Sequence, residues 1–225
     1  MVQDSAICGE RLVEFQCQGL LFDMDGTLLD SSTAMKRIWG DWARRFGFEP
    51  TSFIAKIHGV RGEDTIRALN LPGVDPVAEA LEIERREIED VEGVVAISGA
   101  AEFLAQLPEE RWALVTSAPI RLARARLRAA GLPTPKYIVS GDDVKIGKPD
   151  PTCFLVGAAK LNLNANQCVA FEDAAAGIAS AATAGARVVV VTATHEKHHG
   201  TPHHAIAHFD GAKVHSTASG LTISL

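Results

Sequence analysis

Cysteine is scarce in this 225-residue chain, and the four cysteines that occur are irregularly spaced. None of them forms a Cys-x-x-Cys pair, and two lie in apolar contexts, which is typical of buried free thiols rather than of a disulfide framework. Free thiols persist in reducing compartments, so we expect a cytoplasmic protein. The cysteines are Cys8, Cys17, Cys153 and Cys168.

An excess of basic residues is also missing. The formal net charge is −6 and the sequence pI is about 5.7, whereas a protein that binds a phosphate backbone needs a basic face. Nucleic acid is therefore not an expected partner.

Long hydrophobic runs are absent too. The most apolar stretch near the C-terminus, residues 186–193, is far too short to cross a bilayer and is typical of a buried strand. Residues 1–14 include the charged Asp4, Glu10, Arg11 and Glu14, so they lack the uninterrupted apolar segment of a secretory signal. We expect no membrane partner, and we expect residues 1–14 to form a flexible tail.

What the chain does have is a large apolar fraction, 47% of its residues. Together with its length, this fraction is enough for a substantial core, and the length exceeds the commonest size of a single domain. One domain with an insertion, or two small domains, is expected.

From Gly99 onward, helical and strand-like patterns alternate along the chain. Short apolar strands separated by helices predict a parallel sheet covered on both faces, a doubly wound α/β core of the Rossmann-like kind. The expected helices are 100–107, 119–132, 150–163 and 174–186, and the expected strands are 112–117, 136–140, 168–173 and 187–193.

The region between residues 33 and 97 breaks this alternation, because it has helical periodicity and no clear strand pattern. We expect a small all-helical cap domain here, inserted after the first strand into a core formed by residues 15–32 and 98–225. The apolar stripes that indicate its helices are Ala34, Ile38, Trp42 and Phe46, and then Val77, Leu81, Ile88 and Val91.

An unusual acidic pair follows the first apolar strand, in the segment Phe-Asp-Met-Asp-Gly-Thr. In an extended segment Asp23 and Asp25 point to the same side. Two like charges about 4 Å apart repel by roughly 4 kcal/mol at an effective dielectric constant near 20. The pair is therefore stable only if a cation lies beside it or one carboxyl group keeps a proton, and either arrangement indicates chemistry.

Other reactive side chains also follow predicted strands, and Lys148 lies just before a predicted helix. If the sheet is parallel, these strand ends meet at one edge, where ligands bind. Carboxylates, a hydroxyl group, backbone amides and one lysine suit Mg²⁺-assisted phosphoryl chemistry, because the cations neutralise phosphate oxygens as a nucleophile approaches. These residues are Thr116, Ser117, Lys148, Glu172 and Asp173.

Four segments in this order, FDMDGTLLDS, LVTS, GKPDP and FEDAAAGI, resemble the motifs of the haloacid dehalogenase superfamily of phosphatases, and residues 17–195 carry the resemblance. The inserted helical segment resembles the cap of the phosphoglucomutase-like branch. Residues 56–69 and 108–151 further resemble small sugar and polyol phosphatases, including those that act on 2-deoxyglucose 6-phosphate, hexitol phosphates and glycerol 3-phosphate. The resemblance implies a phosphoric monoester hydrolase whose partner is a small phosphorylated sugar or polyol.

The resemblance also implies a role for each motif residue. Asp23 would be the nucleophile that takes the phosphoryl group, and Asp25 would protonate the leaving alkoxide and later deprotonate water. The Ser117 side chain and the Ala118 amide would bind phosphate oxygens beside Thr116. Lys148 would bridge the nucleophile and the phosphate.

Mg²⁺ is the implied cofactor. The resemblance places it on the Asp23 side chain, the Asp25 backbone carbonyl and Asp173, with Glu172 as a further ligand or a support. Gly26 would permit the tight turn between these ligands.

Two residues of the cap are candidate substrate contacts, because in this family the loop after the first cap helices lies over the active site. They are His58 and Arg61. The alternative for each is a packed or solvated loop residue.

Two further groups of charged or titratable residues are expected to be solvated. One is a basic helix face, and the other is a histidine-rich segment, His195 to His208, that has no clear metal-ligand spacing and is expected to be an exposed loop. The arginines of the helix are Arg121, Arg124, Arg126 and Arg128.

Several alternative functions are weighed against the hydrolase. A phosphomutase of the same fold is disfavoured, since Met35 replaces the mutase histidine and Ile120 and Arg121 replace Lys-Asn. Relatives that cleave carbon–halogen bonds lack the second aspartate, and a signalling receiver module lacks the long insertion. A non-catalytic phosphoacceptor or binding protein is disfavoured by the complete set of chemical groups. We expect a monomer, with a weak dimer as the alternative.

Overall fold

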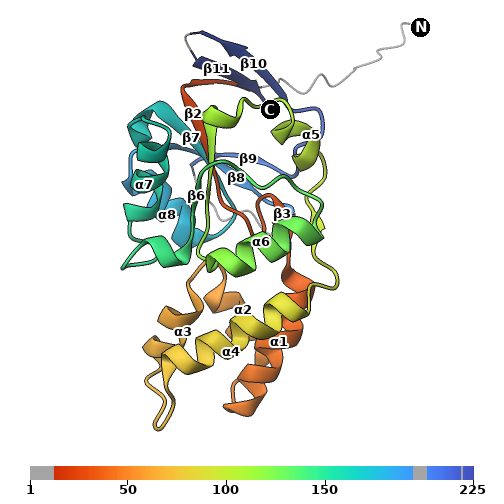
Figure 1. Cartoon of the computed structure of the whole chain (residues 1–225), viewed down its shortest axis with the longest axis vertical. Coiled ribbons are helices and arrows are strands. Elements are labelled where there is room, and N and C mark those ends of the chain that lie inside the picture. The colour runs from red at the N-terminus through yellow and green to blue at the C-terminus, as the bar shows by residue number, and fades with distance from the viewer. Residues whose placement is uncertain (1–12, 195–201, 219) are drawn as a thin grey trace, which may run out of the picture.

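The apolar strands form one parallel six-stranded sheet in the computed structural model, which describes residues 13–194, 202–218 and 220–225 (Figure 1). Every neighbouring pair in this sheet is parallel. In spatial order the strands are β6 (Ile138–Val139), β5 (Trp112–Val115), β2 (Gly19–Phe22), β7 (Cys168–Glu172), β8 (Arg187–Val191) and β9 (His204–Ile206).

The sheet is apolar on both faces because successive strand residues point to opposite sides. In β2, Leu20 and Phe22 belong to one hydrophobic core and Leu21 belongs to another. One core also contains Phe103 and the other Phe154, each from a helix that covers its face.

Helices cover each face, as a doubly wound fold requires. The predicted fold class is confirmed. On the face of Phe103 and Phe22 lie α5 (Ala100–Leu104) and α6 (Ile120–Ala129), and on the other face lie α7 (Thr152–Lys160) and α8 (Ala175–Thr183).

The helical cap is connected to the core by two short strands, β3 (Leu29–Asp30) and β4 (Val95–Ala96), which pair with each other antiparallel. It has its own core around Trp39, Trp42 and Phe53. Its helices are α1 (Ser32–Arg45), α2 (Pro50–Ile57), α3 (Gly62–Leu69) and α4 (Pro76–Glu89).

One predicted apolar stripe of the cap is wrong at Val77 and Leu81, whereas its other members, Ile88 and Val91, are partly buried against a hydrophobic core. Val77 and Leu81 in α4 are 44% and 58% exposed, whereas Ile83 and Glu87 are buried. The reason is the position of α4, which packs beside α6 and turns Val77 and Leu81 toward a cavity rather than into the cap core.

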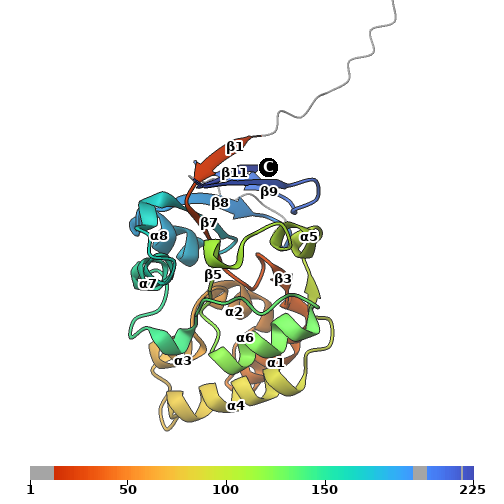
Figure 2. The same cartoon turned by 45° about the horizontal axis from the view of Figure 1, so that its top comes forward.

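The ends of the described chain form a second sheet that the sequence patterns did not indicate. In it β11 (Gly220–Ser224) pairs antiparallel with β1 (Glu14–Cys17) and with β10 (Lys213–Thr217), beyond the end of the large sheet (Figure 2). The Val13 amide also donates to the Leu225 carbonyl over 2.9 Å. The structure thus differs from the expected tail at Val13 and Glu14, and residues 1–12 of that tail lie outside the described residues.

Part of the expected histidine-rich loop is also a strand. Residues His204–Ile206 form β9 and pair with β8 at the sheet edge, so the loop assignment is wrong for these residues. A run with several histidines can still supply the backbone of an edge strand. Residues 195–201 of that segment lie outside the described residues.

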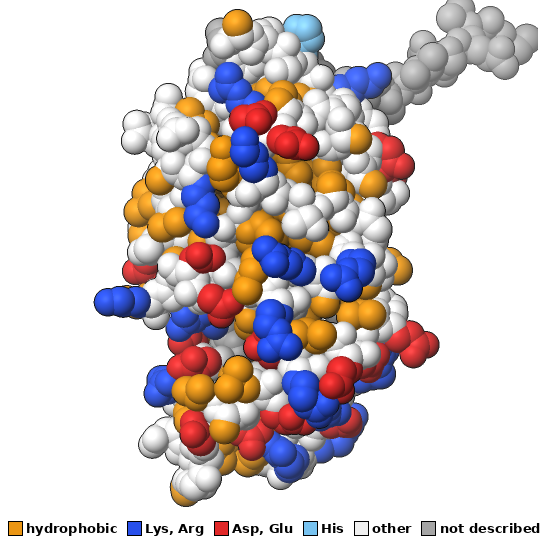
Figure 3. All heavy atoms as spheres, viewed as in Figure 1, with side chains coloured by type: hydrophobic (Ala, Val, Ile, Leu, Met, Phe, Trp, Pro, Cys, Tyr) orange, Lys and Arg blue, Asp and Glu red, His pale blue; other side chains and the backbone are white. Residues whose placement is uncertain are grey.

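Charges on the face drawn in Figure 3 are of both signs, with Lys and Arg side chains among Asp and Glu, most densely over the cap. Ion pairs such as Arg37 with Asp90 connect some of the protein's charged side chains. Among the described residues, no helix combines the length and the apolar character needed to cross a membrane. Cys17, Cys153 and Cys168 are buried free thiols, while Cys8 lies outside the described residues.

Candidate active site

Asp23 lies at the carboxyl end of the central strand β2 and is only 6% exposed. Its backbone amide donates to the Phe171 carbonyl of β7 over 3.0 Å, which continues the parallel pairing past the strand. The chain then turns at Gly26, whose φ is +87° and where a Cβ atom would lie 1.9 Å from Asp173 Oδ2. Only glycine fits this turn, because both the backbone angle and the space exclude a side chain.

Lys148 supplies the one buried ammonium group near Asp23 among the described residues. Its Nζ donates to Asp23 Oδ1 over 2.6 Å, to Glu172 Oε1 over 2.7 Å and to the Val115 carbonyl over 3.0 Å. Burial lowers the pKa of Lys148, but the charges of Asp23 and Glu172 raise it by more than burial lowers it, so the net shift is upward. The ammonium group therefore keeps its charge and joins three neighbouring strands of the sheet.

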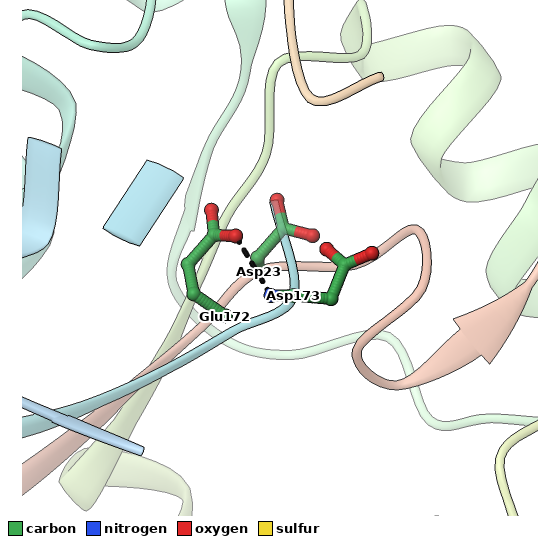
Figure 4. Close-up of side chains that lie close together, drawn as sticks. All are labelled: Asp23, Glu172 and Asp173. Atoms are coloured by element: carbon green, nitrogen blue, oxygen red, sulfur yellow. Dashed lines mark hydrogen bonds between the residues drawn. The ribbon is translucent and has the colours of Figure 1, made fainter. Parts of the chain in front are cut away.

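Three buried carboxylates cluster around this site. Asp23, Glu172 and Asp173 each place an oxygen within 4.8 Å of the others, and Figure 4 shows them converging from the ends of β2 and β7. Burial raises the pKa of Asp23 well above its usual range, and Glu172 and Asp173 raise it further, although Lys148 opposes them.

This donor set fits a divalent cation. The three side chains bring carboxylate oxygens to within 4.8 Å of one another in a buried site, and hard cations such as Mg²⁺ prefer such oxygens. Asp23 and Asp173, two of the predicted metal ligands, are thus brought together, and Glu172 lies beside them.

Asp25 is held by two neighbours that the sequence analysis did not assign to the site. Ser31 Oγ donates to Asp25 Oδ1 over 2.6 Å, and Arg126 Nη1 donates to Asp25 Oδ2 over 2.9 Å. Arg126 Nη2 also donates to Glu87 Oε1 over 2.8 Å. The expectation that Arg126 is solvated is wrong, because this side chain is buried with its two carboxylate partners.

The predicted phosphate-binding residues, 116–118, line a cavity between the cap and the core. In the structure their polar groups form hydrogen bonds within the protein. The Ala118 amide donates to Thr116 Oγ1 over 3.1 Å, and Ser117 Oγ donates to the carbonyl of Gly59 in the cap over 2.8 Å. Ser117 is therefore in contact with the cap, and its proposed contact with phosphate stays a prediction.

His58 reaches the carboxylate cluster from the cap. Its Nε2 donates to Asp173 Oδ2 over 2.7 Å. Burial lowers the pKa of His58, but the hydrogen bond to Asp173 and nearby carboxylates outweigh it and raise the pKa to about 9. A positive side chain thus lies where the metal ligands meet, and its contact with substrate stays a prediction.

Arg61 connects the cap to the core. Its Nε and Nη2 donate to Asp64 over 2.7 and 2.8 Å, and its amino groups donate to the carbonyls of Gly141, Val144 and Lys145. These contacts use each of its five N–H groups. The contact of Arg61 with substrate stays a prediction. In the structure its side chain links the cap to residues 141–145 of the core.

A cavity of about 200 Å³ opens between the cap and the core at these residues. Its polar lining includes Asp23, Asp25 and Arg126, while Trp39 and Leu122 are among its apolar residues. The arrangement can place a small ester with its phosphate near Asp23 and Ser117 and its organic part under α4.

Comparison with known proteins identifies the family of this chain. Residues 17–185 match the haloacid dehalogenase-like hydrolase family. Hexitol phosphatase A of Escherichia coli (strain K12) is 42% identical over 182 residues, which are 79% of this chain and 84% of that protein. Glycerol-1-phosphate phosphohydrolase 2 of Saccharomyces cerevisiae (strain ATCC 204508 / S288c) is 32% identical over 188 residues, covering 77% of this chain and 74% of that protein.

A solved structure of a hydrolase from Pseudomonas syringae has 28% sequence identity and a TM-score of 0.67, covering 78% of this chain and 84% of that one. The predicted family and the predicted enzyme class, a phosphoric monoester hydrolase, are confirmed by these similarities. The chain belongs to the haloacid dehalogenase-like hydrolase family.

Proposed function

We propose that this hydrolase is a Mg²⁺-dependent phosphatase that cleaves small sugar or polyol phosphate monoesters through an aspartyl phosphate on Asp23. The observation that carries the proposal is the buried contact of Asp23 with Lys148 beside Glu172 and Asp173, at the edge of a cavity that also contains Asp25. A nucleophile, cationic partners and a second carboxylate therefore lie within one small site.

In the first half of the reaction, an Asp23 carboxylate oxygen attacks phosphorus and forms a new phosphorus–oxygen bond. The bond from phosphorus to the ester oxygen breaks, and its electron pair stays on that oxygen. Asp25 gives its proton to the same oxygen, so the product leaves as an alcohol rather than as an alkoxide.

In the second half, Asp25 takes a proton from a water molecule that attacks the phosphorus. The bond between phosphorus and Asp23 breaks, inorganic phosphate leaves, and both carboxyl groups return to their starting states. Lys148 stays beside Asp23 throughout and offsets negative charge at the phosphate oxygens.

Asp23 and Asp173 would hold Mg²⁺, with the Asp25 carbonyl as a third protein ligand and Glu172 as a ligand or a support. When bound, the ion neutralises phosphate oxygens and so lowers the barrier to attack by an anionic carboxylate.

The size and lining of the cavity support a small neutral organic group. The cavity volume of about 200 Å³ lies below the range of roughly 300–1,000 Å³ that is typical of pockets for drug-sized ligands. Beside Trp39 and Leu122, the cavity offers the carboxylate of Glu84, which can accept hydrogen bonds from sugar hydroxyls. The two similar enzymes from Escherichia coli and Saccharomyces cerevisiae are named for a hexitol phosphate and a glycerol phosphate, which are esters of this kind.

Phosphate release from a panel of esters tests this function. The panel contains hexitol 6-phosphates, 2-deoxyglucose 6-phosphate, glycerol phosphate and fructose 1-phosphate, each with Mg²⁺ and with excess EDTA. We expect Mg²⁺-dependent release from at least one of them, and loss of steady turnover in Asp23→Asn and Asp25→Asn. The proposal fails if no monoester is hydrolysed with Mg²⁺ present.

The same assay separates hydrolysis from phosphomutase activity. A mutase would convert a hexose 1-phosphate to its isomer and release little inorganic phosphate. A hydrolase releases phosphate and free sugar in equal amounts.

A further inference from the structure

Both oxygens of the Asp25 carboxylate are tied by hydrogen bonds. Ser31 binds Oδ1 over 2.6 Å and Arg126 binds Oδ2 over 2.9 Å. Because a carboxylate with both oxygens engaged has little freedom to turn, these two neighbours decide where the side chain points.

Arg126 is itself fixed by the cap. Its second amino group donates to Glu87 of α4 over 2.8 Å, and the side chains of Arg126 and Glu87 are only 8% and 7% exposed. Figures 1 and 2 both show α6, which carries Arg126, beside α4. A continuous chain of charged hydrogen bonds therefore runs from Asp25 through a core helix to a cap helix.

The other neighbour of Asp25 also lies next to the cap. Ser31 directly precedes α1, at the point where the chain leaves β3 for the first cap helix. The two anchors of Asp25 are thus a residue at the entrance to the cap and an arginine held by the last cap helix. A guanidinium group is planar and its N–H directions are fixed, so a shift of Glu87 moves Arg126 and with it Asp25.

We propose that Arg126 is a positioning residue for Asp25, and that Glu87 sets the position of Arg126 when the cap covers the cavity. The proposal rests on the proposed function, in which Asp25 gives a proton to the leaving oxygen. The Glu87 contact joins α4 of the cap to α6 of the core, so the packing of the cap against the core contributes to the position of Asp25.

The identity of the leaving group isolates this role. An alkyl ester would leave as a strongly basic alkoxide and needs the proton of Asp25 as its phosphorus–oxygen bond breaks. The p-nitrophenolate ion is a weak base and leaves without that proton. Since kcat/KM covers only the steps through this bond cleavage, the ratio of kcat/KM for the two esters reports how well Asp25 is placed.

The experiment compares kcat/KM with Mg²⁺ for p-nitrophenyl phosphate and for the alkyl ester of the panel that the unmodified enzyme hydrolyses fastest. The variants are Arg126→Gln, Arg126→Lys and Glu87→Gln. The matched control is Arg124→Gln, which changes an exposed arginine on the same helix. Turnover of both esters by the unmodified enzyme tests the proposed function separately from the positioning role.

We expect Arg126→Gln to lower kcat/KM for the alkyl ester about a hundredfold and for p-nitrophenyl phosphate by less than about threefold, given the usual contribution of a general acid. Glu87→Gln should change the ratio in the same direction by about tenfold, because the amide still accepts a hydrogen bond from Arg126. The ratio of kcat/KM for the two esters in Arg126→Lys should lie between the ratios in Arg126→Gln and in the unmodified enzyme. Arg124→Gln should leave this ratio unchanged.

Equal losses on both esters in Arg126→Gln and Glu87→Gln would overturn the proposal, as would unchanged kcat/KM on the alkyl ester. Both esters are measured on one preparation, so a smaller folded fraction cannot alter the ratio. If Arg126→Gln does not fold, the ratio in Glu87→Gln decides.

Discussion

Lys148 offers the strongest stability test of the site. Its ammonium group donates to two buried carboxylates, Asp23 over 2.6 Å and Glu172 over 2.7 Å, and its own side chain is only 1% exposed. Replacing it with methionine keeps the approximate length but leaves both carboxylates without their cation. Removing one partner of a buried ion pair costs about 3–5 kcal/mol.

This cost predicts a large fall in Tm. For a chain of this size, each kcal/mol corresponds to roughly 2–4 °C, so metal-free Lys148→Met should melt about 6–20 °C lower near neutral pH. The loss should shrink as the pH falls, because protonation neutralises the carboxylates that Lys148 pairs with. It should also shrink in excess Mg²⁺, since a bound cation replaces the missing charge.

Thermal unfolding of the metal-free protein, followed by circular dichroism, measures this difference. Lys145→Met is the matched control, because that side chain is exposed three residues earlier in the same loop. If the Tm of Lys148→Met falls no further than that of Lys145→Met, the ammonium group does not stabilise the carboxylate cluster as argued.

Three more predictions concern the same site. Mg²⁺ at a hundred times its Kd should stabilise the protein by about 2.7 kcal/mol, seen as a higher Tm than in EDTA, and Asp173→Asn should lose most of this gain. In the metal-free protein, His58 should stabilise the fold fully below about pH 6.5, and because its folded pKa is raised to about 9, this stability should be lost as the pH rises through that value. The Tm difference between the unmodified protein and His58→Gln across this range measures it, and a constant difference would contradict the argument. Gly26→Ala should abolish turnover and the Mg²⁺ response, since its Cβ atom would lie 1.9 Å from Asp173 Oδ2, and normal activity in this variant would refute the packing argument.

The parallel sheet and the main site residues were predictable from the sequence because they follow from local patterns. Apolar strands that alternate with helices predict a parallel sheet, and parallel strands place their carboxyl ends at one edge. Asp23 and Asp173 directly follow β2 and β7, Lys148 lies shortly before α7, and the three side chains meet in the structure.

Arg126 was missed although the sequence contained a signal for it. Four arginines in one helix suggested a single solvated face, but Arg126 lies four residues after Leu122 and directly before Leu127, which places it on the buried face. Glu87 follows the buried Ile83 by the same interval in α4. In both α6 and α4, the informative pattern was a charged residue at a position that faces the core.

Other features depend on contacts that no local pattern contains. Strand β1 pairs with β11 at the other end of the chain, and nothing in either segment specifies the partner. Val77 and Leu81 carry an apolar pattern that fits a core or a ligand cavity equally well, and only the packing of α4 beside α6 distinguishes the two.

The central claim, that Asp23 takes the phosphoryl group, is tested most directly by mass spectrometry of acid-quenched Asp25→Asn after mixing with p-nitrophenyl phosphate and Mg²⁺. This ester needs no proton from Asp25 to leave, whereas hydrolysis of the intermediate needs Asp25 as a base, so the intermediate should accumulate. We predict one added phosphoryl group, on the peptide that contains Asp23, and none in Asp23→Asn. An unmodified mass in Asp25→Asn, or a phosphoryl group on another residue, would contradict the mechanism.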